Sequence, residues 1–296
     1  MVAAMAKVKS KLKAKPAKPA KPAKRAKPKA RATPAKRATP KAKPVTPAAP
    51  TWVPTGRAWG PESHLARAIE LHRQGKLAPA RAAYERAIAE EDGGTAPKLQ
   101  LLQVLDALED VPAVLALVDE LSGRGKPGRV TVVQSPVICV CEARARLLQE
   151  DFTAAEAAAR AAVALDENDV EGWRLIAVAL AAQGNATAAL EPASRVTSLA
   201  PKWPTGHFTR AIYLHRAGRT AEAAVAVERS TQLEPNDGDA WFNLACYRAL
   251  LGDKREALAA LTEAIRIDKS NAAAARADGD LVSLANDARF KKLTAA

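Results

Sequence analysis

Acidic residues are absent from the first 61 positions of this 296-residue chain. All 32 Asp and Glu follow Pro61, whereas 17 of the 45 Lys and Arg precede it. The formal net charge of +13 therefore divides into +17 for the N-terminal segment and −4 for the remainder, where 28 cations face 32 acids. Averages over the whole chain hide two segments of opposite character.

The N-terminal segment also lacks the side chains that could build a hydrophobic core. Residues 1–51 contain no aromatic residue and, apart from proline, few apolar side chains larger than alanine, and nine prolines lie between Pro16 and Pro50. Ordering a chain costs about 1–2 kcal/mol per residue, which this composition cannot offset by burial. The prolines also prevent an amphipathic helix. We expect residues 1–51 to be a disordered tail and residues 52–60 to be a linker.

Cysteines and catalytic motifs are scarce. Cys139, Cys141 and Cys246 have the spacing of neither a disulfide framework nor a zinc site, so we expect buried free thiols and no metal. The chain has no His-Glu-x-x-His motif, no glycine-rich phosphate loop and no nucleophile elbow. These absences predict a protein that is not an enzyme and needs no cofactor.

Long hydrophobic runs are missing as well. No segment approaches the length of about 18 apolar residues that a membrane helix needs, and the basic N-terminus has no apolar signal-like run. We therefore expect no transmembrane segment and a cytoplasmic location. An organelle transit peptide is the weaker alternative, because the prolines prevent the amphipathic helix that such peptides form.

After Gly60 the sequence becomes rich in alanine and leucine, and small residues recur every 34 positions. Each unit predicts two helices joined at a glycine, for example residues 171–183 and 186–200 around Gly184. The series with this interval are Ala143, Ala177, Ala211 and Ala245; Ala155, Ala189, Ala223 and Ala257; Gly184, Gly218 and Gly252; Trp173, His207 and Trp241; and Pro201 and Pro235.

This pattern of Trp, small residue, Gly, Ala and Pro resembles the tetratricopeptide repeat. The resemblance implies an all-α solenoid of about six helix pairs, with two divergent repeats and an insertion loop in residues 61–135 and four clear repeats in 136–271. In the second repeat, Glu109 stands where glycine is expected. Residues 272–296 resemble the terminal helix that caps such arrays. The six repeats are expected to begin near Pro61, Thr95, Pro136, Val170, Pro204 and Gly238.

The resemblance also implies a binding site, because set positions of each first helix face a peptide groove in this family. Their apolar and arginine side chains suit an extended or helical peptide with hydrophobic anchors and one or two acidic groups. The alternative is that the same side chains pack between neighbouring helices. The predicted groove residues are Leu65, Ile69, Arg73, Val140, Arg144, Arg174, Val178, Phe208, Ile212, Arg216, Phe242 and Cys246.

The Ala-Lys-Pro tail resembles the tails of linker histones and of some bacterial histone-like proteins. An extended chain at about 3.1 Å per residue places a cation about every 9 Å, while duplex DNA offers a charge about every 1.7 Å, so binding needs no register. A solvated spacer and a contact with anionic membrane are the alternatives. The predicted nucleic-acid contacts are Lys13, Lys15, Lys18, Lys21, Lys24, Arg25, Lys27, Lys29, Arg31, Lys36 and Arg37.

These features together predict a non-enzymatic adaptor. Its repeats would bind a protein or peptide, and its tail would bind nucleic acid without sequence preference and associate the protein with nucleoid or chromatin. The alternative is a protein-assembly scaffold whose tail is only a spacer or a membrane contact.

Overall fold

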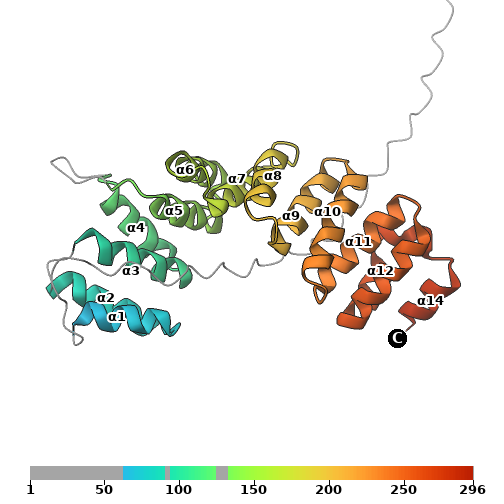
Figure 1. The fold of residues 1–296 in the computed structure, drawn as a ribbon, viewed down its shortest axis with the longest axis horizontal. Coiled ribbons are helices and arrows are strands. Elements are labelled where there is room, and N and C mark those ends of the chain that lie inside the picture. The colour runs from blue at the N-terminus through green and yellow to red at the C-terminus, as the bar shows by residue number, and fades with distance from the viewer. Residues whose placement is uncertain (1–62, 91–93, 125–132, 296) are drawn as a thin grey trace, which may run out of the picture. The chain divides into compact units, whose positions relative to one another are not determined.

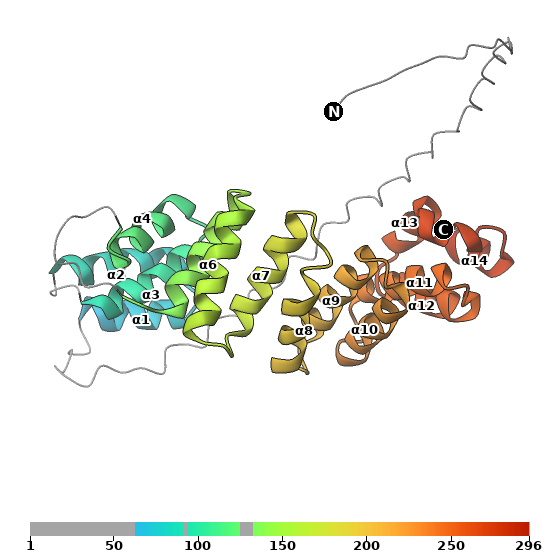
Figure 2. The same ribbon diagram turned by 90° about the horizontal axis from the view of Figure 1, so that it is seen from above.

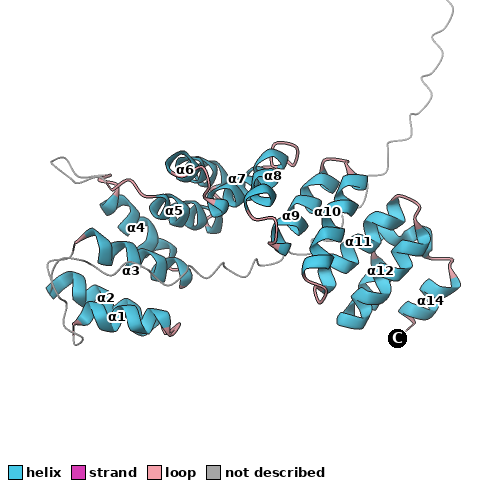
Figure 3. Cartoon of the chain, viewed as in Figure 1, coloured by secondary structure: helices cyan, strands magenta, loops and turns pink. Residues whose placement is uncertain are grey.

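The computed structural model describes residues 63–90, 94–124 and 133–295. Two compact units divide the chain, residues 1–36 and 37–296, and every described residue belongs to the second. The predicted tail, the linker, the first repeat start at Pro61 and residues 125–132 of the insertion loop lie outside the described residues. The described ranges contain helices and no strand (Figure 3).

Twelve helices alternate as first and second members of six pairs, and each packs on the next in chain order (Figures 1 and 2). A three-helix cap, α13 Ser270–Ala277, η1 Gly279–Leu284 and α14 Ala288–Thr294, follows them. The first helices are α1 His64–Arg73, α3 Thr95–Ala107, α5 Pro136–Leu148, α7 Val170–Ala182, α9 Pro204–Arg216 and α11 Gly238–Leu250. The second helices are α2 Leu77–Glu90, α4 Val111–Leu121, α6 Phe152–Leu165, α8 Leu190–Leu199, α10 Thr220–Leu233 and α12 Lys254–Ile267.

A residue with positive φ separates the two helices of every pair. Gly184, Gly218 and Gly252 have φ of 84°, 81° and 88°, a region that glycine enters without a steric penalty. Glu109 and Glu150 take the same place with φ of 55° and 60°. The turn is therefore a property of the repeat, and it forms even where the sequence supplies no glycine.

Helix α8 begins later than the sequence pattern predicts. The pattern places a helix over residues 186–200, but residues 186–189 form a turn and α8 begins at Leu190. Pro192 explains the difference, because it has no amide hydrogen to donate to the carbonyl of Ala188 and its ring crowds that carbonyl. The fourth repeat therefore has a shortened second helix.

A side chain near the start of each of three first helices ties that helix to the turn before it. The indole nitrogens of Trp173 and Trp241 donate to the carbonyls of Glu167 and Pro235 at 2.8 and 2.9 Å. His207 Nε2 donates to the carbonyl of Pro201 at 3.0 Å. These bonds span the same six residues, which explains why a ring with an N–H donor recurs at this position.

Three hydrophobic clusters follow one another along the array, and alanine supplies much of the buried surface. Side chains of α6 lie close to the backbone of α7 at Gly172, where an added Cβ would lie 2.8 Å from Val163 Cγ1. Cys141 and Cys246 are buried free thiols as expected, whereas Cys139 is half-buried. The core is thus built for short distances between helices rather than for large side chains.

The C-terminal cap differs from the single terminal helix that the sequence pattern indicated. Asp278 accepts a hydrogen bond from the amide of Asp280 and starts η1, and Asp287 accepts from the amide of Arg289 and starts α14. Each aspartate caps a new helix, so the segment breaks into three short helices. η1 packs on α11, which brings the cap over the last repeat.

Candidate functional site

The predicted groove residues all lie on first helices, and we call the surface that they share the first-helix face. They differ sharply in exposure. Leu65, Phe208, Phe242 and Cys246 are buried, with exposed fractions of 5%, 3%, 2% and 4%. At most 5% of each of these four residues is accessible to a partner. They are therefore not the hydrophobic anchors that the pattern indicated.

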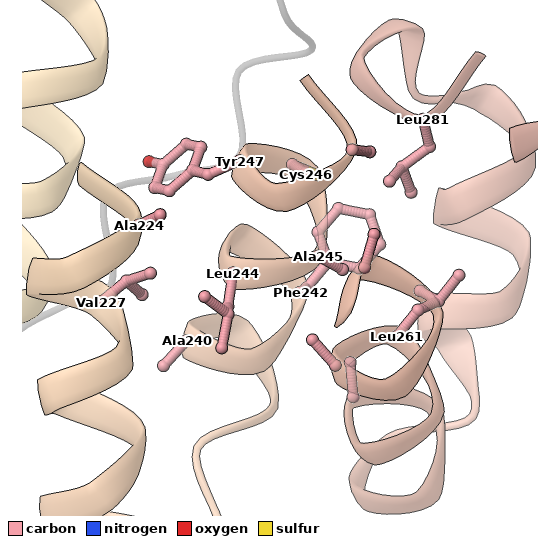
Figure 4. Packing of buried hydrophobic residues seen from close by; sticks show 14 of the residues in the cluster. Ala224, Val227, Ala240, Phe242, Leu244, Ala245, Cys246, Tyr247, Leu261 and Leu281 are labelled. Atoms are coloured by element: carbon pink, nitrogen blue, oxygen red, sulfur yellow. The ribbon is translucent and has the colours of Figure 1, made fainter. Parts of the chain in front are cut away.

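Phe242 shows why a residue that the repeat pattern places in the groove is buried instead. Leu244 and Ala240 face Val227 of α10, while Phe242 points to the other side of α11, where Leu261 of α12 and Leu281 of η1 lie (Figure 4). η1 packs against α11, so the cap covers a position that repeat geometry alone leaves open. The alternative of packing between helices therefore holds for Phe242.

Four further apolar positions are half-buried and keep part of their surface. Ile69 packs against the first cluster, Val140 against the middle one, and Ile212 against the middle and last clusters. Val178 on α7 is also half-buried. These side chains could contact a partner only as part of a wider surface.

Arg144 and Arg174 form an ion-pair network with two acids instead of presenting free charges. The guanidinium of Arg144 binds Asp106 of α3 at 2.6 Å and Glu171 of α7 at 2.6 and 2.9 Å. Arg174 binds both oxygens of Glu171, at 2.7 and 2.6 Å. The exposed fractions of the four side chains run from 11% to 23%, so water screens these contacts only in part. The network joins three successive first helices.

The protonation of the network follows from this geometry. Burial alone would raise the pKa of Glu171, but the hydrogen bonds and charges of Arg174 and Arg144 outweigh it and hold that pKa below its ordinary value. Burial raises the pKa of Asp106, and the charge of Arg144 offsets only part of the effect. Glu171 is thus the carboxylate around which the two arginines are organised.

Arg73 and Arg216 are the exposed cations of the first-helix face. Arg73 binds Glu70 of its own helix at 3.0 Å, a pair that solvent screens strongly. Arg216 is the last residue of α9. Burial raises the pKa of Tyr213 to about 12 and that of Tyr247 as well; the charges of Arg174 and Arg216 oppose the first shift, and the charge of Arg216 opposes the second. An exposed guanidinium at a helix end can pair with a carboxylate of a bound peptide.

Sequence reasoning missed Asp106 and did not assign Glu171 a role. Both occupy first-helix positions on repeats adjacent to Arg144, so opposite charges meet from neighbouring helices. Pairing charged positions between consecutive repeats is the signal that finds such a network. A single repeat read alone does not contain it.

Other kinds of site find no support in the described ranges. Within residues 63–90, 94–124 and 133–295, no group of three or more His, Cys, Asp or Glu is placed to hold a metal ion. No helix in the same ranges is long and apolar enough to cross a membrane.

Comparisons with known proteins agree with this architecture. The tetratricopeptide-repeat family matches residues 142–204 and again residues 238–271. No curated protein matches the sequence. Among solved structures, YrrB, described as a tetratricopeptide-repeat protein with an unusual peptide-binding site, is 18% identical, covers 66% of this chain and 97% of its own, and has a TM-score of 0.55.

Two further solved structures share the fold. The C-terminal part of a repeat-containing protein from Cytophaga hutchinsonii is 11% identical, covers 77% of this chain and 92% of its own, and has a TM-score of 0.60. MamA from Desulfovibrio magneticus RS-1 is 15% identical, covers 58% of this chain and 96% of its own, and has a TM-score of 0.50.

The alternating helix pairs make the described part of the chain an all-α helical repeat array. Residues 142–204 and 238–271 match tetratricopeptide repeats, and the described part of the chain has the fold of a tetratricopeptide-repeat array, a kind of domain that mediates protein–protein interactions.

Proposed function

We propose that this protein is a non-enzymatic adaptor that binds a protein or peptide on its first-helix face and nucleic acid through its basic tail. The observation that carries the first half is the match to the repeat family together with the exposed Arg216 at the end of α9. The partner that this chemistry fits carries at least one acidic group.

The ion-pair network indicates which arginines of the first-helix face are available to a partner. Arg144 and Arg174 already bind Glu171, so displacing them would leave a largely buried carboxylate without its partners, which is costly. In the described part of the chain Arg216 forms no ion pair with an acidic side chain. We therefore expect an acidic group of the partner to bind at Arg216.

The tail half of the proposal rests on composition alone. Sixteen cations lie between Lys7 and Lys43 with no acid among them, whereas the remainder of the chain has a net charge of −4. Lysines on an extended chain attract phosphates regardless of base sequence, and there is no aromatic residue before Trp52 on which bases could stack. The tail is therefore expected to bind nucleic acid without sequence preference.

The test of the partner surface is a charge reversal with a matched control. We expect Arg216→Glu to reduce co-purification of the protein partner from the native cell at least about fivefold, because one attraction becomes a repulsion. Arg229→Glu makes the same change on the exposed side of α10 and should leave the partner bound. Nuclease treatment before capture removes proteins that are held only through nucleic acid.

Stability decides whether the result reports binding. Both arginines are exposed, so the free energy of unfolding of each variant should differ from that of the wild type by less than about 0.5 kcal/mol. Equal partner recovery with Arg216→Glu and Arg229→Glu would reject the first-helix face as the docking surface. If the partner is lost only after nuclease treatment, the partner is held through nucleic acid and not by the first-helix face.

A further inference from the structure

A shallow pocket of about 560 Å³ lies between α12, the last second helix, and α14 of the cap. Ala259 and Leu293 give it an accessible apolar lining, and the buried Leu258, 5% exposed, lies beneath them. Thr262 also lines it, but its hydroxyl donates to the carbonyl of Leu258 at 2.7 Å and so is already satisfied. The pocket can therefore accept an aliphatic side chain.

Three cations line the same pocket: Arg255 on α12, and Arg289 and Lys292 on α14. Arg289 binds Asp287 at 3.4 Å and is 67% exposed. Within the described part of the chain, Arg255 and Lys292 have no ion-pair partner. The pocket thus combines an apolar lining with two cations that no acid in the described ranges neutralises.

The arrangement follows from helix periodicity. Arg255, Ala259 and Thr262 are separated by four and three residues, so they share one face of α12. Arg289 and Lys292 are three residues apart on α14 and likewise share a face. Both helices therefore turn cationic and small or apolar side chains toward the same space.

This chemistry favours one class of occupant. A phosphate or a lone carboxylate would use the cations and leave the apolar lining in water, whereas an apolar side chain alone would leave the cations without partners. We propose that the pocket between α12 and α14 docks an acidic peptide segment of a partner protein, with an aliphatic side chain on Ala259 and Leu293 and carboxylates paired with Arg255 and Lys292.

This surface is separate from the first-helix face, because it is formed by a second helix and the cap. The array would then hold two protein segments at once, one on each surface. The inference goes beyond the proposed function, since either surface can be disabled while the other is kept.

The test uses the full chain and a synthetic peptide in which photoleucine is flanked by glutamates. The basic tail also attracts acidic peptides, so the readout is the position of the cross-link after illumination and not the total amount bound. We expect cross-links within Lys254–Ile267 and Ala288–Thr294. A peptide with glutamines in place of the glutamates should lose these cross-links without any change to the protein.

A pair of double variants separates local from general electrostatics. Arg255→Glu with Lys292→Glu should lower the cross-link yield at α12 and α14 at least about tenfold, because two attractions become repulsions. Lys254→Glu with Lys291→Glu makes the same net charge change on the same helices at positions that do not line the pocket, and should stay within about twofold. Circular dichroism confirms that each variant is folded.

Three outcomes would overturn the proposal: cross-links that show no preference for α12 and α14, equal losses in the two double variants, or an unchanged yield with the glutamine peptide. Displacement of the peptide from α12 and α14 by duplex DNA at matched charge would identify a phosphate surface instead and would also overturn it.

Discussion

Glu109 and Glu150 occupy a backbone position at which four other turns of the array have glycine. Their φ angles of 55° and 60° lie in the left-handed region, where an L-residue crowds its own carbonyl. The family pattern showed Glu109 as a departure, and the structure shows that the turn is kept at a conformational cost. Single residues here carry strain that the repeat imposes.

Replacing Glu150 by glycine should therefore stabilise the protein. We expect Glu150→Gly to raise the free energy of unfolding by about 1 kcal/mol, since glycine removes the left-handed penalty. Gln149→Gly is the control, because Gln149 has an ordinary φ of −84° and should lose stability instead. Thermal unfolding of the two variants gives the comparison, and a lower midpoint for Glu150→Gly would contradict the account.

Glu171 should make stability depend on pH in a defined direction. Its pKa in the folded protein is below the ordinary value of 4.5, so its stabilising contribution is complete above that value and is lost as the pH falls through the folded pKa. Glu171→Gln should cost about 3 kcal/mol near neutral pH, the usual effect of breaking a largely buried ion pair. Urea unfolding at a series of decreasing acidic pH values should show a smaller difference in unfolding free energy between Glu171→Gln and the wild type at each step.

Glu191→Gln is the control for that titration, because Glu191 is exposed on α8. Its effect on the free energy of unfolding should stay small at every pH. A Glu171→Gln cost that is the same at neutral and acidic pH would show that the arginines do not depend on the charge of Glu171.

At the scale of helices, the close packing of neighbouring helices is the feature that the alanine and glycine pattern predicts best. The helix pairs, their glycine turns and the small residues between them could all be read from the interval of 34 residues. The late start of α8 follows from Pro192, a local effect that overrides the repeat. The burial of Phe242 depends on η1, which no repeat encodes, and so the candidate site was predicted less well than the fold.

Gly172 tests this close packing between α6 and α7. Alanine is normally the better helix former by about 1 kcal/mol, yet a Cβ here would lie 2.8 Å from Val163 Cγ1. We expect Gly172→Ala to destabilise the protein by about 1–2 kcal/mol, because overcrowding outweighs the propensity gain. Urea unfolding measures the change.

A second substitution makes the cause specific. Val163→Ala removes the nearest atom that the new Cβ would meet and leaves Asp169 Oδ2 at 3.1 Å, so Gly172→Ala should cost less in the Val163→Ala background than in the wild type. Equal costs in both backgrounds would place the strain elsewhere.

For the whole molecule, the separation of charge between tail and array is the basis of the adaptor proposal. The array has a net charge that is slightly negative and contains the ion pairs of Glu171, whereas residues 1–61 contain no acid. Positive charge is therefore concentrated in residues 1–61. The adaptor proposal assigns nucleic-acid binding to the tail and protein recognition to the array. The adaptor proposal requires that these two activities be separable.

Titration of a DNA duplex with the full chain and with residues 52–296, at several salt concentrations, tests this claim most directly. If about half of the 16 cations between Lys7 and Lys43 contact phosphates, the logarithm of affinity should fall against the logarithm of salt concentration with a slope of roughly −7. Changing the DNA sequence should alter affinity little, and removing residues 1–51 should abolish binding. No binding at low salt, or binding that survives the deletion, would contradict the adaptor and favour a scaffold whose tail is a spacer.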